Sequence, residues 1–152
     1  MKLLSILLLF CFGWFTSTPF EFSNATVRQF NAGQRMGGQN VQYQVKFIAN
    51  KPSRKITFKK MWIGSEQVEF RVSGIAKDNS MTATYGRGDT IVIEANMSYR
   101  PNENGALTLV DNGLSKKVKE YKGKAIIEYT YKGKIKEFIV ADFTRLETVN
   151  YP

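Results

Sequence analysis

The chain has 152 residues, of which 43% are hydrophobic and 23% are charged, and its formal net charge is +9. This composition is that of a globular protein and excludes a disordered chain, while the length leaves room for one compact domain. The sequence contains no histidine and one cysteine, Cys11, which excludes Ser-His-Asp and Cys-His catalysis and the usual zinc, copper and haem ligand sets. We therefore expect a protein that is not an enzyme and that carries no cofactor.

Residues 1–20 have the pattern of a helical, cleavable signal peptide. Lys2 supplies a positive charge, an apolar run of 13 residues spans 3–15, and small polar residues follow it. The run is shorter than the ~20 residues that span a bilayer as a helix, although an uncleaved anchor is the alternative. We expect cleavage between residues 16 and 25 and a mature domain of residues 26–152.

The protein is accordingly expected to be exported, either periplasmic or secreted, and to meet the membrane only transiently during export. A lipoprotein acylated at Cys11 is disfavoured because the bulky Phe10 precedes the cysteine. Removal of residues 1–20 takes away Lys2 and leaves 21 basic and 13 acidic residues, a formal charge of +8. This excess favours anionic partners as a class without distinguishing among them.

Alternation of apolar and polar residues predicts β-strands along the mature chain. It is clearest where Val41, Tyr43, Val45 and Phe47 alternate with polar residues. In chain order, strands are expected at 26–30, 41–47, 56–63, 68–72, 81–85, 91–99, 107–110, 125–131 and 135–143. Turn residues separate them, and a repeated Tyr-Lys-Gly-Lys at 121–124 and 131–134 marks the last hairpin. Seven to nine such strands predict an all-β fold, an antiparallel Ig-like β-sandwich, with a closed barrel as the alternative.

A lysine-rich segment is the strongest candidate for binding. Tyr121, Tyr129 and Tyr131 lie within it. Lysines beside aromatic rings can bind a polyanion, whereas the alternative is a solvated face whose lysines keep sheet edges from pairing. Tyr129 and Tyr131 alternate with Ile127, so we expect them in the core. The candidate polyanion-binding residues are Lys116, Lys117, Lys119, Lys122, Lys124, Lys132, Lys134 and Lys136.

Other motifs are better explained by structure than by chemistry. Arg87-Gly88-Asp89 matches an integrin-recognition tripeptide but fits a turn before a strand. The acidic stretches 78–79, 102–104 and 111–112 lack the spacing of a calcium loop and fit turns. Trp62 is expected in the core rather than as a ligand platform. The carboxylate pairs weighed for glycoside hydrolysis are Glu66 with Glu69 and Glu94 with Glu128.

Four short segments carry a resemblance to a known group of proteins. They are Lys60-Met61-Trp62-Ile63-Gly64, Gly88-Asp89-Thr90-Ile91, Tyr121-Lys122-Gly123-Lys124-Ala125 and the closing Tyr151-Pro152. With these segments the chain resembles small exported β-sandwich proteins of Gram-negative bacteria, a group without an established function. The resemblance implies a periplasmic or surface sandwich and supplies no site residues.

The sequence therefore predicts an exported, non-enzymatic binding or structural module at the cell envelope. The first hypothesis is a protein-interaction domain that pairs with an unknown protein through a sheet face or edge. The alternative is a polyanion binder that recognises lipopolysaccharide or an acidic glycan or lipid through the lysine-rich carboxy-terminal hairpin. We expect no nucleic acid partner.

Overall fold

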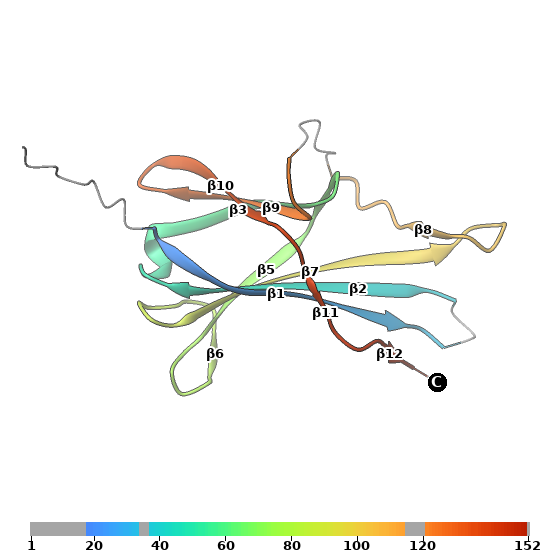
Figure 1. Ribbon diagram of the computed structural model, residues 1–152, viewed down its shortest axis with the longest axis horizontal. Coiled ribbons are helices and arrows are strands. Elements are labelled where there is room, and N and C mark those ends of the chain that lie inside the picture. The colour runs from blue at the N-terminus through green and yellow to red at the C-terminus, as the bar shows by residue number, and fades with distance from the viewer. Residues whose placement is uncertain (1–17, 34–36, 115–120, 152) are drawn as a thin grey trace, which may run out of the picture.

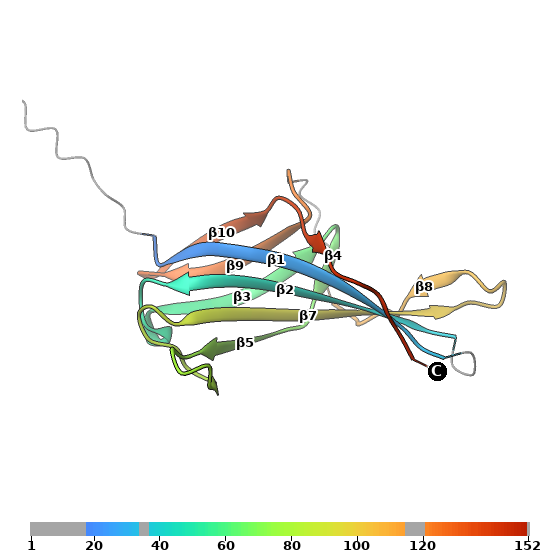
Figure 2. The same ribbon diagram turned by 60° about the horizontal axis from the view of Figure 1, so that its bottom comes forward.

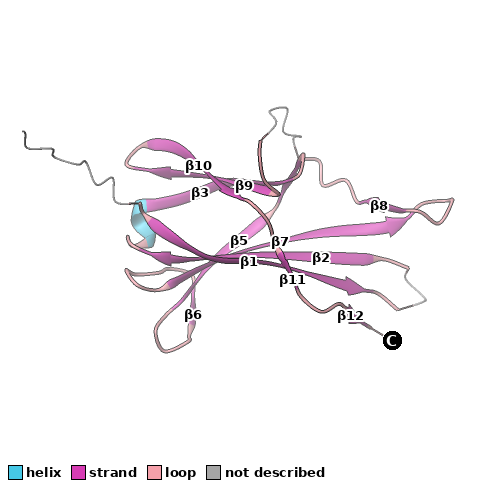
Figure 3. Ribbon diagram, in the orientation of Figure 1, coloured by secondary structure: helices cyan, strands magenta, loops and turns pink. Residues whose placement is uncertain are grey.

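The computed structural model describes residues 18–33, 37–114 and 121–151 and arranges them as two layers of β-sheet (Figure 1). Within these residues the only helical element is the short turn η1 (Ser53–Lys55), drawn in cyan in Figure 3. None of the described segments forms an apolar helix of the length that would cross a membrane. The segment expected as a signal, apart from residues 18–20, lies outside the described residues.

The larger layer, called the long sheet, has the strand order β11-β1-β2-β7-β5-β6. Two further short strands join it, because β12 pairs with β1 and β8 pairs with β7. Neighbouring strands are antiparallel, except that β11 and β12 run parallel to β1. The bounds are β1 (Phe20–Asn31), β2 (Gln39–Ala49), β5 (Phe70–Ile75), β6 (Met81–Thr82), β7 (Thr90–Pro101), β8 (Leu107–Leu109), β11 (Thr144–Arg145) and β12 (Val149–Asn150).

The smaller layer, called the short sheet, has the order β10-β9-β3-β4 and is antiparallel throughout. Its strands are β3 (Ile56–Ile63), β4 (Glu66–Val68), β9 (Ala125–Tyr131) and β10 (Lys134–Val140). The turn between β9 and β10 has two residues with positive φ, Lys132 at 53° and Gly133 at 72°. This is the backbone of a type I′ hairpin turn, so the turn predicted from the Tyr-Lys-Gly-Lys repeat is confirmed.

The prediction of an all-β, sandwich-like fold is confirmed, and the closed-barrel alternative is wrong because the strands divide into two separate sheets. The expected number of seven to nine strands is too low, since the described residues form twelve. The predicted strand 68–72 is in fact two strands in different sheets. Val68 ends β4, Glu69 crosses between the layers, and Phe70 begins β5. β11 and β12 were not predicted, because two residues are too few to show alternation.

The core lies between the two layers and is built from every second residue of the central strands. Phe47 on β2 is fully buried, and its ring lies 4.5 Å from that of Phe20, 5.0 Å from Phe138 and 6.4 Å from Phe58. The core also contains Val45, Met61, Ile91, Ile93, Ile127, Tyr129, Tyr131 and Val140. The prediction that Tyr129 and Tyr131 belong to the core is therefore confirmed.

The amino end of β1 is anchored in the fold. The Pro19 side chain is fully buried, and its carbonyl oxygen accepts hydrogen bonds from the amides of Asn50 at 2.9 Å and Lys51 at 3.1 Å. Phe20 is 5% exposed and packs in the core. Cleavage in the later part of the 16–25 window would therefore remove core side chains, and an earlier cut would keep them.

Burial of Tyr85 makes the free energy of unfolding fall at alkaline pH. Its ring is 6% exposed, and burial raises its pKa from 10.0 to about 12. The unfolded chain loses the proton of the Tyr85 hydroxyl near pH 10, while the folded chain retains it. The contribution of this hydroxyl to the free energy of unfolding is therefore complete below pH 10 and is lost as the pH rises towards 12. We expect the loss to amount to about 2 kcal/mol and to be absent in Tyr85→Phe. Urea unfolding of both proteins from pH 9 to 12 measures it, and parallel curves would contradict it.

Candidate functional site

The lysine-rich segment does not form one patch in the structure. Lys122 and Lys124 lie just before β9, whereas Lys132 lies just after it. Because β9 has seven residues, the two groups are about 23 Å apart along the strand. Lys116, Lys117 and Lys119 lie outside the described residues. The structure thus separates the described candidates into two groups, at opposite ends of the short sheet.

Lys134 and Lys136 occupy the inner face of β10, which is the edge strand of the short sheet. They pair with Tyr131 and Tyr129, whose rings point into the core. The ammonium groups of Lys132 and Lys136 lie 5.4 and 5.8 Å from the centre of the Tyr131 ring. These lysines cover a buried tyrosine, and inward-pointing charges on an edge strand discourage pairing with a second copy of that edge.

Among the described residues, no strand pairs with the outer edge of β10. In the two-residue hairpin the pair Tyr131 and Lys134 exchanges hydrogen bonds, so the peptide groups of alternate residues from Ile135 onward point away from β9. The short sheet ends at β10. On its outer face, Ile135 is 69% exposed and Ile139 is 45% exposed. The strand therefore offers backbone donors and acceptors flanked by apolar side chains.

A second candidate site lies where the long sheet extends beyond the short one. Figure 2 shows β1, β2, β7 and β8 continuing past the end of the short sheet. The inner face of these strands forms the floor of a groove of about 900 Å³, called the distal groove. Its floor residues are Val27, Gln29, Gln39, Val41, Tyr43, Met97, Tyr99, Leu107 and Leu109, and its wall is formed by 63–66, 123–124, Asp142 and Phe143, with Arg145 at one end.

The distal groove joins aromatic rings with charged groups of both signs. The Tyr43 and Phe143 rings make an edge-to-face contact at 5.1 Å. Burial raises the pKa of Tyr43, the nearby Tyr99 raises it further, and the positive charge of Arg145 opposes both effects. Two carboxylates, Glu66 and Asp142, balance the two cations Lys124 and Arg145, so the lining has no net charge.

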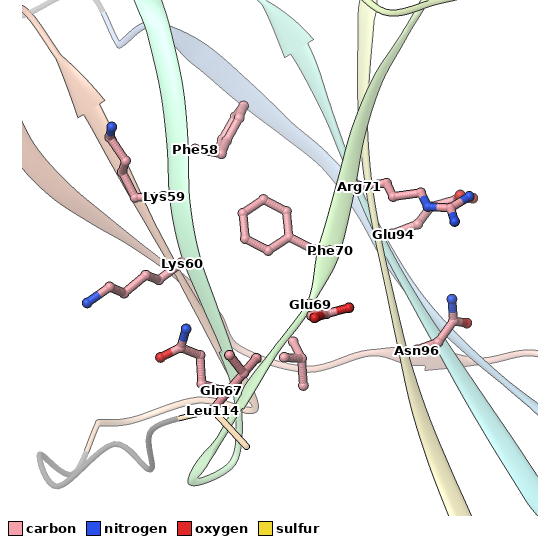
Figure 4. A pocket seen from close by; sticks show the side chains of 11 residues that line it. Phe58, Lys59, Lys60, Gln67, Glu69, Phe70, Arg71, Glu94, Asn96 and Leu114 are labelled. Atoms are coloured by element: carbon pink, nitrogen blue, oxygen red, sulfur yellow. The ribbon is translucent and has the colours of Figure 1, made fainter. Parts of the chain in front are cut away.

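A second hollow, called the lateral groove, opens between β3 and β5 (Figure 4). It has a volume of about 670 Å³. Phe58 and Phe70 lie between the two strands, and Arg71 lies beside Glu94. The Glu94 carboxylate also accepts a hydrogen bond from the Gln44 amide at 2.8 Å. Its charged groups thus have neighbours on the long sheet, and we assign no ligand to this groove.

Neither carboxylate pair weighed for hydrolysis converges. Glu94 lies on the outer face of the long sheet and Glu128 on the outer face of the short sheet, beside Lys60. The core separates them. Glu66 lines the distal groove and Glu69 the lateral groove.

The loop motifs are turns, as predicted. Asp89 accepts a hydrogen bond from the Gly86 amide at 2.7 Å, which closes the turn that contains Arg87 and Gly88. Ser80 donates to Asp78 through its hydroxyl and its amide, and these hydrogen bonds lower the pKa of Asp78. The other two acidic stretches bind their own backbone in the same way: Asn102 accepts from 104 and 106, Asp111 from 113, and Asn112 from 114.

Trp62 is buried, but not in the core between the sheets. It is 7% exposed and lies on the outer face of the short sheet, paired with Ile126. The Lys60 ammonium group lies 5.9 Å from its ring centre. The prediction that Trp62 is buried is thus confirmed, and its ring lies outside the cluster between the two sheets. Alternation places neighbouring Met61 inward, so Trp62 must face outward.

Sequence reasoning missed the distal groove, although its signal is present. Along the inner row of β2 the residues change from Phe47 and Val45, which are fully buried, to the partly buried Tyr43, Val41 and Gln39. On β7 the same row ends at Tyr99. Apolar residues with polar ends replace purely apolar ones where the opposing sheet stops.

Comparison with known proteins adds no relative. Neither a protein-family model nor a curated protein nor a solved structure matches this chain.

Proposed function

We propose that the protein is an exported, non-enzymatic interaction module of the cell envelope, and that it binds an extended segment of a partner protein along the open edge of β10. The observation that carries this proposal is that β10 is the last strand of the short sheet among the described residues, with Ile135 and Ile139 exposed beside its outer edge. Strand addition at a free edge obtains affinity from main-chain hydrogen bonds and specificity from alternate side chains.

Export and an immunoglobulin-like architecture are parts of the same proposal. The charged and apolar pattern of residues 2–15 supports a signal, and the burial of Pro19 and Phe20 favours a cut before them. The strand orders β1-β2-β7-β5 and β10-β9-β3 correspond to the orders A-B-E-D and G-F-C of immunoglobulin domains. In this correspondence β4 is an added strand beside the second sheet.

The charges around β10 specify the chemistry of the partner strand. Lys134 and Lys136 flank one face of the edge, and Ile135 and Ile139 flank the other. A strand that alternates acidic and apolar residues satisfies both faces at once, since opposite charges on neighbouring strands attract and apolar pairs exclude water. A basic strand would be repelled by Lys134 and Lys136, so the edge discriminates between an acidic and a basic partner.

A capped nine-residue peptide of alternating glutamate and valine is the probe that tests the proposal. We expect it to slow hydrogen exchange of the Ile135 and Ile139 amides, measured by NMR, because these amides point away from β9. Ile135→Lys should weaken binding about tenfold by removing the apolar contact. Met81→Lys is the matched control, because Met81 is also 69% exposed but lies on β6 of the long sheet.

A peptide of alternating lysine and valine serves as the opposite probe and should not bind. Unchanged exchange at the Ile135 and Ile139 amides with millimolar glutamate peptide would refute edge pairing. The polyanion alternative gives a different result: heparin binds with steep salt dependence, and Lys132→Gln with Lys134→Gln abolishes that binding.

A further inference from the structure

The distal groove has the form of a site for a chain-like ligand. Its floor spans four neighbouring strands, β1, β2, β7 and β8. Three interstrand spacings give it a length of about 14 Å. With a volume of about 900 Å³ it falls in the range of small-ligand sites.

The residues of the floor favour a ligand that is both apolar and hydrogen-bonding. The inner row keeps apolar residues there, namely Val27, Val41, Met97, Leu107 and Leu109. Among them it carries four partly buried residues with polar groups, Tyr43, Tyr99, Gln29 and Gln39. Tyrosine offers a flat apolar ring and a polar hydroxyl group, and the glutamine amides supply both hydrogen-bond donors and acceptors.

The charges of the groove favour a neutral ligand. Although the expected mature chain carries +8, the two carboxylates of the groove balance its two cations. A polyanion would meet Glu66 and Asp142 in the groove, and like charges brought together at an interface are costly. The same carboxylates and the Arg145 guanidinium serve a neutral polyol well, because they accept from and donate to its hydroxyl groups.

From this combination we infer that the distal groove is a binding site for a neutral oligosaccharide, whose sugar rings lie on Tyr43 and Tyr99 and whose hydroxyls meet the glutamines and the charged rim. A pyranose ring has a C–H face that packs on an aromatic ring and an edge of hydroxyls that requires hydrogen-bond partners. The floor of the site lies on the long sheet, whereas the β10 edge belongs to the short sheet.

Titration of the purified protein with cellohexaose, maltohexaose and hexa-N-acetylchitohexaose tests the site by calorimetry and by NMR of the backbone amides. We expect at least one of the three to bind and to shift the amides of Tyr43, Met97 and Tyr99. Tyr99→Ala should weaken that binding by at least about tenfold. Tyr151→Ala is the matched control, because Tyr151 is 57% exposed and its ring stacks on Phe30 on the outer face of the same sheet, at 6.3 Å.

Salt gives a second, independent readout. Binding of a neutral glycan should change little between about 50 and 200 mM salt, whereas a polyanion loses orders of magnitude in affinity over that range. Three results overturn the inference: no binding by any of the three sugars at millimolar concentration, an equal loss in Tyr99→Ala and Tyr151→Ala, or shifts confined to residues outside the groove.

Discussion

Replacing Phe47 with alanine is expected to lower the free energy of unfolding by about 3–5 kcal/mol, as is usual for a buried aromatic ring. Phe47 is fully buried, and rings from both sheets surround it: Phe20 and Phe22 from β1, Phe58 from β3 and Phe138 from β10. Removing its ring leaves a cavity that touches both layers, so neighbouring side chains on one layer cannot close it without losing contact with the other. The loss is a large share of the roughly 5–15 kcal/mol that stabilise a typical domain.

Phe22→Ala is the matched control for this effect. Phe22 belongs to the same aromatic cluster, and its ring stacks on Phe138 at 5.6 Å, but 45% of the side chain is exposed. Water can fill the space that its ring leaves, so we expect a loss of about 1–2 kcal/mol. Equilibrium unfolding in urea measures both variants. Equal losses would show that Phe47 is not the centre of the core.

Gly123→Ala is expected to destabilise the fold by about 2–4 kcal/mol, because two costs add at one position. Gly123 has a φ of +138°, which side-chain-bearing residues rarely adopt. A Cβ atom there would lie 2.5 Å from Cγ2 of Ile139 and 2.8 Å from the carbonyl oxygen of Val140. That oxygen already accepts a hydrogen bond from the Lys124 amide at 2.8 Å, so the backbone cannot move aside without losing the bond.

Gly133→Ala isolates the backbone part of the effect. Gly133 also has a positive φ, 72°, but nothing lies within 4 Å of the position that its Cβ would take. We expect a loss of about 1 kcal/mol there, which is the cost of the left-handed conformation alone. Thermal unfolding of the two variants side by side gives the difference. A loss in Gly123→Ala no larger than in Gly133→Ala would mean that the contact with β10 is absent in solution.

Alternation predicted the strands best where a strand has one buried face over its whole length. The bounds of β3 and β9 agree with the predicted 56–63 and 125–131, because Met61 and Ile127 sit in clear rows of inward residues. The same rule failed at 68–72. Val68 and Phe70 both face the core, so the alternation continues although the chain passes from one sheet to the other. Periodicity reports which way a side chain points, and it does not report the sheet to which the strand belongs.

The candidate sites were harder to predict, because closeness in sequence is not closeness in space. Lys124 and Lys132 are near in the chain but lie at opposite ends of β9. Tyr43 and Tyr99 meet in one groove although they come from β2 and β7. Their meeting depends on the register between these strands, which sets Tyr43 opposite Ala95 and Gln39 opposite Tyr99. A single sequence does not specify that register.

The parallel pairing of the last strands with β1 has a consequence for the order of folding. β1 is the first strand of the described residues, and among them its outer edge pairs with β11 and β12, where Thr26 meets Thr144 and Phe30 meets Val149. A polypeptide leaves a ribosome or a translocation channel amino end first, so this edge stays uncovered until residues 144–150 have emerged. An uncovered edge is a template for intermolecular pairing. The arrival of residues 144–150 is therefore the event that covers this part of the β1 edge, and a factor that holds the emerging chain would have to protect β1 until then.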